Sequence, residues 1–190
     1  KVLALSTVSN LGLMVACAGV GTAETLWAGI FLMMFHAISK ALLFQNVGAT
    51  ENALHSRDIE SMHGLIFRLP KLGAFMFIGI AGMFLAPFGM LISKWSALKA
   101  SVDMGNILLV LFIVYGSATT MFYWTKWMSK IISYTDTEIK VTDITKKDES
   151  LSLTVHAVLM IALCLLFPLL STVYVEPLLT EVFGVSTAVL

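Results

Sequence analysis

Long apolar runs, separated by short polar stretches, dominate the pattern of hydrophobic and polar positions along the chain. A helix needs about 20 predominantly apolar residues to cross the hydrocarbon core of a bilayer. Runs of about this length lie at 2–20, 24–48, 70–97, 105–128 and 151–175. The pattern therefore predicts an all-α integral membrane protein with about five transmembrane helices.

The third run is interrupted at Ala86-Pro87-Phe88-Gly89. Proline removes a backbone donor from a helix, and glycine loosens the chain, so we expect this span to be broken near Pro87 and Gly89. Backbone groups left unpaired at membrane depth are tolerated only where they line a cavity or lie inside protein. The fourth run ends in an aromatic segment, 122–127, that is typical of the membrane interface.

Basic residues are distributed unequally between the two sides that five spans would create. Of the 12 Lys and Arg residues, Lys40 and Lys94 fall inside spans, and Lys99 lies on one side of the membrane. The remaining nine, which include Lys1, lie on the other side. The positive-inside rule then places the N-terminal end of the chain in the cytoplasm. We expect a multi-pass protein of the cytoplasmic (inner) membrane of the cell. The polar segment 129–150 is expected to be a cytoplasmic loop, and 151–190 a trailing transmembrane helix and tail.

The composition supports this class of protein. Hydrophobic residues make up 58% of the chain and charged residues 13%, which excludes an ordinary soluble domain. The net charge is zero, so we expect no nucleic-acid partner. We find no metal-like Cys spacing, no Gly-rich phosphate loop and no nucleophile constellation, so redox chemistry would belong to another chain. Because the chain begins with Lys1 rather than Met, we expect it to be a piece of a longer polypeptide.

Two ionisable residues, His36 and Lys40, lie in the apolar second span. Residues four apart lie on the same face of a helix. A lysine at the centre of a transmembrane helix costs roughly 2.5–3.5 kcal/mol, and such residues mark ion or proton pathways. The alternatives are that Lys40 extends to the headgroups and that His36 joins two helices through a hydrogen bond.

A third ionisable residue, Lys94, follows Pro87 by seven residues and lies nearer the outer face. Extension of its side chain to the interface is again the alternative. Broken helices form ion sites in transporters, which favours a functional role. From the cytoplasm outwards the order would be Lys40, His36, Lys94, the layout of one proton path.

Three segments resemble the antiporter-like subunits of respiratory complex I, of Mrp cation/proton antiporters and of energy-converting membrane-bound NiFe hydrogenases. They are Leu3–Gly12, His36–Phe44 and Pro87–Trp95, in the family's order. The resemblance implies an inverted-repeat antiporter-like fold, of which residues 1–128 would be the C-terminal part of the proton-translocating domain. The segments 56–65 and 87–95 look most similar to the large membrane subunit of the energy-converting hydrogenases.

The resemblance also implies roles for individual residues. Lys40 matches the central channel lysine, His36 the histidine one turn before it, and Lys94 the charged residue of the second broken helix. Two positions depart from the family pattern: Leu32 stands where another histidine is often found, and Trp95 where an acidic residue often follows the lysine. We therefore expect the relay to depend more on water than on side chains.

The function implied is that of a non-catalytic, proton- or sodium/proton-translocating subunit in a redox-driven membrane complex. Its partners would be other membrane subunits and the lipid bilayer, and it would bind no cofactor. Iron–sulfur clusters and a NiFe or flavin centre would lie only in partner subunits. The alternatives are a subunit of a stand-alone Mrp-type antiporter and a structural membrane subunit that conducts nothing.

Overall fold

The structure, a computed structural model, describes residues 1–85, 89–134 and 144–184. Its helices follow in the order α1 (Val2–Val20), α2 (Ala23–Leu54), the 3-10 turn η1 (Ile59–Met62), α3 (Leu65–Arg68), α4 (Pro70–Phe84), α5 (Gly89–Asp103), α6 (Ile107–Ile132), α7 (Lys147–Leu170), the π-helical segment η2 (Ser171–Val175) and α8 (Glu176–Phe183). Among the described residues, five helical stretches are long and apolar enough to cross a membrane. The predicted all-α fold with five spans is confirmed.

Local signals in the sequence explain where the helices begin and end. Gly21, with φ 73°, ends α1 in the left-handed conformation that glycine adopts readily. Thr22 and Thr25 then form a capping box at the start of α2. Pro70 occupies the first turn of α4, where a backbone donor is not needed. The Asn106 side chain caps α6 by accepting a hydrogen bond from the backbone N–H of Leu109.

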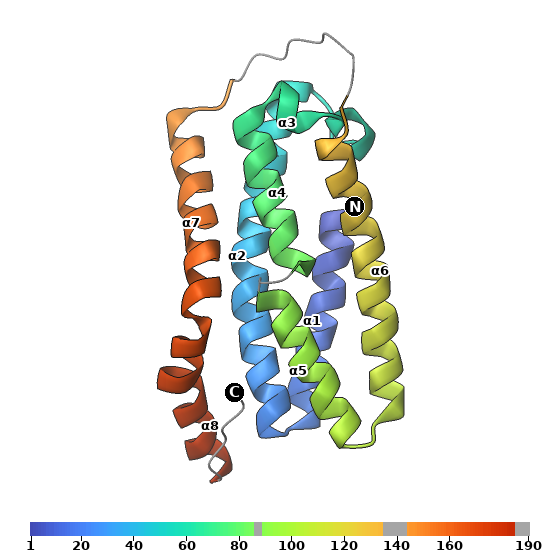
Figure 1. The fold of residues 1–190 in the computed structure, drawn as a ribbon, viewed down its shortest axis with the longest axis vertical. Coiled ribbons are helices and arrows are strands. Elements are labelled where there is room, and N and C mark those ends of the chain that lie inside the picture. Colours follow the sequence, from blue (N-terminus) through green and yellow to red (C-terminus); the bar gives the residue numbers. More distant parts are fainter. Residues whose placement is uncertain (86–88, 135–143, 185–190) are drawn as a thin grey trace.

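Helix α2 is the centre of the bundle. It packs against α1, α4, α5 and α7, and α6 covers the side formed by α1, α4 and α5. Figure 1 shows α2 between α7 on one side and α1 and α6 on the other, with α4 and α5 stacked end to end along it. Any side chain on α2 that turns inward therefore reaches several helices at once.

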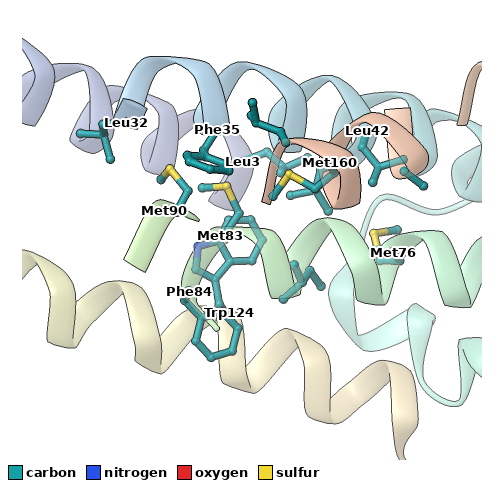
Figure 2. Close-up of a cluster of buried hydrophobic side chains, with 14 of the residues drawn as sticks. Leu3, Leu32, Phe35, Leu42, Met76, Met83, Phe84, Met90, Trp124 and Met160 are labelled. Carbon is teal, nitrogen blue, oxygen red and sulfur yellow. The ribbon is translucent and has the colours of Figure 1, made fainter. Parts of the chain in front are cut away.

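The third span is broken, as the sequence predicts. α4 ends at Phe84, the chain is extended at Leu85 (φ −93°, ψ 145°), and α5 begins at Gly89. Pro87 itself lies outside the described residues. Figure 2 shows buried side chains of α2, α4, α5 and α6 meeting near this break, with Phe35, Met83, Phe84, Met90 and Trp124 among them.

Several predicted boundaries are corrected by the structure. α2 continues to Leu54 rather than ending at 48, because its polar residues there are satisfied inside the bundle: the Asn46 amide donates to the Leu72 carbonyl oxygen (2.9 Å), and Thr50 donates to the Asn46 side chain (3.1 Å). The predicted 129–150 loop is shortened at both ends, since α6 runs to Ile132 and α7 begins at Lys147. The last span passes through η2 and continues beyond 175 into α8.

The N-terminal end of α1 lies apart from most of the basic residues. The Lys40 amine, near the middle of α2, contacts Leu3, so α1 begins level with the middle of α2 (Figure 1). Lys1 therefore does not join the basic residues at the end of the bundle formed by α3 and the adjoining ends of α4, α6 and α7. The described members of that basic group are Arg57, Arg68, Lys71, Lys126, Lys130, Lys146 and Lys147, while Lys140 lies outside the described residues.

Candidate functional site

The Lys40 side chain points across the bundle and not along α2. The residue is 6% exposed, and its amine donates a hydrogen bond to the Leu3 carbonyl oxygen at 2.8 Å and another to the Ser6 hydroxyl oxygen, both on α1. The amine also lies 5.3 Å from the centre of the Trp124 ring on α6 and 5.9 Å from that of Phe44. In this structure the Lys40 side chain therefore does not extend along α2 towards the headgroups.

The contacts of Lys40 continue into a polar stripe on α1. The Ser6 hydroxyl donates to the Leu3 carbonyl oxygen at 2.9 Å, and the Asn10 amide donates to the Ser6 carbonyl oxygen at 2.8 Å. Ser6 and Asn10 are each 2% exposed. Because they are four residues apart, they form one inward-facing edge of the helix, and this edge leads away from Lys40.

His36 lies one turn before Lys40 and is 5% exposed. Among the residues that the structure describes, neither nitrogen of its ring has a hydrogen-bond partner. A hydrogen bond that joins two helices, the alternative for this residue, is thus not found in the described part of the chain. Both Lys40 and Lys94 lie close enough to interact electrostatically with the ring.

Lys94, on α5, is half-buried and lines a cavity of about 250 Å³ between α1, α5 and α6. The cavity is mixed in character, since apolar side chains alternate with hydroxyl and amide groups. Its lining comprises Ser9, Asn10, Gly12, Leu13, Ala16, Lys94, Leu109, Phe112, Ile113, Gly116, Ser117 and Thr120. A volume of this size with several polar walls is large enough to hold water.

Helix α1 relates the positions of the two lysines. Lys40 contacts Leu3 and Ser6, whereas the Lys94 cavity runs along α1 from Ser9 to Ala16. Lys94 therefore lies nearer the α1–α2 turn than Lys40 does, and Asn10 both lines the cavity and contacts Ser6. Lys94 is near enough to act electrostatically on both Lys40 and His36.

The close approach of α2 and α5 depends on Gly89, which the sequence placed at the break. A Cβ atom at this position would lie 1.8 Å from Cζ of Phe35, the residue before His36. The first turn of α5 thus packs directly on the Phe35 ring. Any larger residue would push α5, and with it Lys94, away from α2.

Leu3, Ser6, Asn10 and Trp124 were not predicted as site residues. For Ser6 and Asn10 a signal existed, because two polar residues four apart in an apolar helix repeat the spacing of His36 and Lys40. For Trp124 the sequence was misleading. The segment 122–127 has the pattern of an interfacial aromatic belt, yet Trp124 is 0% and Trp127 3% exposed.

Among the described residues there is no group of three or more His, Cys, Asp or Glu side chains that could hold a metal ion. Ion pairs in the described part of the chain join Arg57 with Glu51, and Lys126 and Lys130 with Glu60. All of these lie at the basic end of the bundle. The site of Lys40 and Lys94 therefore consists of cationic and neutral groups.

Comparison with known proteins identifies relatives of this bundle. Residues 1–120 match the family described as NADH:quinone oxidoreductase/Mrp antiporter, transmembrane. The chain is 32% identical over 123 residues to NADH-quinone oxidoreductase subunit L of Rickettsia bellii, a match that covers 64% of this chain and 19% of the relative. It is 30% identical over 119 residues to hydrogenase-4 component B of Escherichia coli, covering 56% of this chain and 18% of the relative.

A solved structure has the same fold. A chain of the Mrp complex from Dietzia sp. superimposes with a TM-score of 0.74 at 22% identity, over 88% of this chain and 40% of that one. The chain thus spans about a fifth of the length of the curated relatives it matches. A putative antiporter subunit, mnhA2, of Staphylococcus aureus is 28% identical over 165 residues, covering 70% of this chain and 21% of the relative, so the curated matches span several branches at similar identity and identify the family and not the branch.

Proposed function

Since this chain belongs to the NADH:quinone oxidoreductase/Mrp antiporter transmembrane family, we propose that it is a proton-translocating, or sodium/proton-translocating, subunit of a redox-driven ion-pumping complex. It would act beside other membrane subunits, and the redox centres would lie in partner subunits. The basic end of the bundle would face the cytoplasm, in accordance with the positive-inside rule.

The proposal rests above all on the surroundings of Lys40. Its amine is buried in the centre of the bundle and is bonded to neutral oxygens on α1. Among the described residues, no carboxylate pairs with it. A buried charge without an opposite charge is costly, and releasing a proton removes that cost. Lys40 would therefore be the central proton carrier.

His36 and Lys94 would extend the path outwards from Lys40. His36 is the titratable side chain of lowest ordinary pKa at the site, and histidine is suited to passing protons near neutral pH. Lys94 would exchange protons with water in its cavity, which Asn10 connects to Ser6 and so to Lys40. Water would carry the proton wherever side chains do not meet, as the apolar Leu32 and Trp95 led us to expect.

The test is Lys40→Ala in the full-length protein within its assembled complex. We expect ion-gradient formation in inverted membrane vesicles to be abolished while assembly survives. Lys99→Ala is the matched control, because Lys99 is an exposed lysine farther along the same helix as Lys94. Normal gradient formation by the Lys40→Ala complex would overturn the proposal.

The alternative of a non-conducting structural subunit expects both lysines to reach the lipid headgroups. Against it stands the burial of the Lys40 amine between α1 and α6. The alternative of a stand-alone Mrp-type antiporter shares every feature of the site. Purification of the complex distinguishes it, because an antiporter of this kind would copurify with no redox subunit.

A further inference from the structure

We propose that Leu3, Ser6 and Trp124 form a cage for the ammonium form of Lys40, in which Trp124 is a positioning residue that holds the lysine against α1. This inference rests on the proposed role of Lys40 as a proton carrier. The cage consists of the Leu3 carbonyl oxygen, the Ser6 hydroxyl oxygen and the face of the Trp124 ring. Its members come from α1 and α6, which both lie on the side of the lysine's own helix that faces away from α7 (Figure 1).

The oxygen side of the cage is arranged to accept hydrogen bonds. The Ser6 hydroxyl donates its single proton to the Leu3 carbonyl oxygen, so the Ser6 oxygen is left to accept from Lys40. The Leu3 carbonyl oxygen also accepts from the Thr7 hydroxyl at 2.9 Å. Hydrogen bonds from an ionised donor are roughly twice as strong as neutral ones, so these acceptors favour the ammonium over the neutral amine.

The aromatic side of the cage acts in the same direction. A cation within about 6 Å of a Trp ring centre is attracted by the ring, and a neutral amine loses this attraction. Trp124 meets the condition at 5.3 Å and is fully buried, so water does not weaken the interaction. The face of the ring is therefore what Trp124 contributes to the site.

Neighbouring aromatic rings fix the position of Trp124. Trp127 stacks on it with ring centres 5.6 Å apart and planes 9° apart, and Tyr123 packs at 5.3 Å. Trp127 is itself 3% exposed, and no contact joins it to the Lys40 amine among those found in the described residues. The two tryptophans therefore differ in one respect that an experiment can use.

The cage has a purpose at this site because Lys40 is buried and Lys94 opposes its charge. Lys94 acts on it from α5, and His36 lies one turn away on α2. From α6, Tyr123 is the nearby titratable group, and the contacts from α1 are neutral oxygens. Without the cage, Lys40 would lose its proton at a lower pH. The cage thus sets the pH range over which the carrier is loaded.

The experiment compares the pH profiles of ion transport for Trp124→Leu and Trp127→Leu in the full-length protein within its complex. We expect the alkaline limit of transport to fall by about one pH unit in Trp124→Leu, which corresponds to a roughly tenfold weaker hold on the proton. Trp127→Leu removes a buried ring of the same size that does not contact the Lys40 amine but supports Trp124, so it should lower the limit by clearly less than Trp124→Leu does. Trp124→Phe keeps an aromatic face, so its alkaline limit should fall by less than that of Trp124→Leu.

Two results would overturn the cage. One is an equal shift, or none, in Trp124→Leu and Trp127→Leu, since the ring would then act through packing alone. The second result applies if Trp124→Leu does not assemble, in which case Ser6→Ala and Trp124→Phe replace it. The cage is then overturned if the alkaline limit of transport is unshifted in both variants. Loss of transport in Lys40→Ala together with an unshifted Trp124→Leu would refute the cage and leave the proposed function standing.

Discussion

The Lys40 amine lies 2.8 Å from the carbonyl oxygen of Leu3, so the buried charge of the central helix is bound to the first turn of α1. This bond joins residues 37 positions apart in the chain. It directs the lysine towards the helix that also carries Ser6 and Asn10, and away from both ends of α2. The relationship decides which residues lie next on a path to Lys94.

His36→Leu should reduce transport without destabilising the fold. Neither ring nitrogen has a hydrogen-bond partner among the described residues, and removing a buried polar group that lacks a partner is nearly neutral or stabilising. A positioned histidine that passes protons, in contrast, contributes roughly 10²–10⁴-fold to the rate of the step it assists. We expect an unchanged thermal midpoint in detergent and a loss of transport of at least about tenfold.

Thr50→Val is the reciprocal control for His36→Leu. Thr50 is as deeply buried on the same helix, but its hydroxyl donates to Asn46 at 3.1 Å. Breaking this bond should cost roughly 1–3 kcal/mol of stability and leave transport per assembled complex intact. Full transport in His36→Leu would remove His36 from the path.

Asn10→Leu should impair transport through the cavity of Lys94. The Asn10 side chain lines the cavity, and its amide bonds only to the Ser6 carbonyl oxygen of its own helix among the hydrogen bonds of the described residues. A leucine fits a helix well but makes this wall apolar, which disfavours water. We expect a severalfold loss of transport with little change in the thermal midpoint.

Thr119→Val provides the matched comparison for Asn10→Leu. The Thr119 hydroxyl also bonds within its own helix, to the Tyr115 carbonyl oxygen, but Thr119 is exposed and is not part of the cavity wall. Transport should therefore be unchanged by this substitution. Equal transport in Asn10→Leu and Thr119→Val would show that the cavity does not carry ions.

The sequence was sufficient to predict the fold and the residues that carry charge into it. Hydropathy located the five spans, and the four-residue spacing placed His36 and Lys40 on one face. Hydropathy could not predict that α2 extends to Leu54, because the polar groups of Asn46 and Thr50 are satisfied by contacts inside the bundle. Hydropathy averaged over a window of residues assigns such polar residues to a loop.

The partners of Lys40 could not be predicted for a different reason. One is a backbone carbonyl, which every residue has, so no residue type marks it. Another, Trp124, belongs to a segment whose composition is that of an interfacial belt, and only the packing of α6 against α1, α4 and α5 buries it. Contacts of this kind depend on how the helices are arranged, and the pattern within a single helix does not contain that information.

Gly89→Ala should destabilise the bundle because of the Phe35 ring. The added Cβ would lie 1.8 Å from Phe35 Cζ, so α5 or the ring must move. Overpacking of this kind costs about 1–3 kcal/mol, and we expect a lower thermal midpoint and reduced transport as Lys94 is displaced. Phe35→Leu in the same chain should recover part of both losses, since it removes the ring atoms nearest to position 89.

Gly116→Ala is the control for this substitution, because no atom lies within 4 Å of the corresponding Cβ position. Alanine favours a helix interior by about 0.5–1 kcal/mol over glycine, so the thermal midpoint should stay the same or rise. Independent, additive effects of Gly89→Ala and Phe35→Leu would contradict the contact on which the prediction rests.

The last prediction concerns the cytoplasmic end proposed for the bundle, where Glu60 attaches the segment after α2 to α6. The Glu60 carboxylate lies 2.5 Å from the Lys130 amine and 3.8 Å from that of Lys126. The hydrogen bond from Lys130 lowers the pKa of Glu60 below its ordinary value of 4.5. Because the folded state has the lower pKa, the attachment is fully present above about pH 4.5 and weakens as the pH falls through the lowered value.

The amide of Gly64 reports on this attachment, since it donates to the Lys130 carbonyl oxygen at 2.9 Å. We expect Glu60→Gln to speed hydrogen exchange at Gly64 at neutral pH, and the difference from the unaltered protein to shrink as the pH falls below about 4.5. Glu51→Gln breaks only the Arg57 pair, which does not reach α6, and should leave Gly64 protected. If Glu60→Gln and the unaltered protein exchange equally at neutral pH, the backbone bond of Gly64 holds the segment without help from Glu60. Any pH dependence of the protection of Gly64 would then have to come from another group at this end of the bundle.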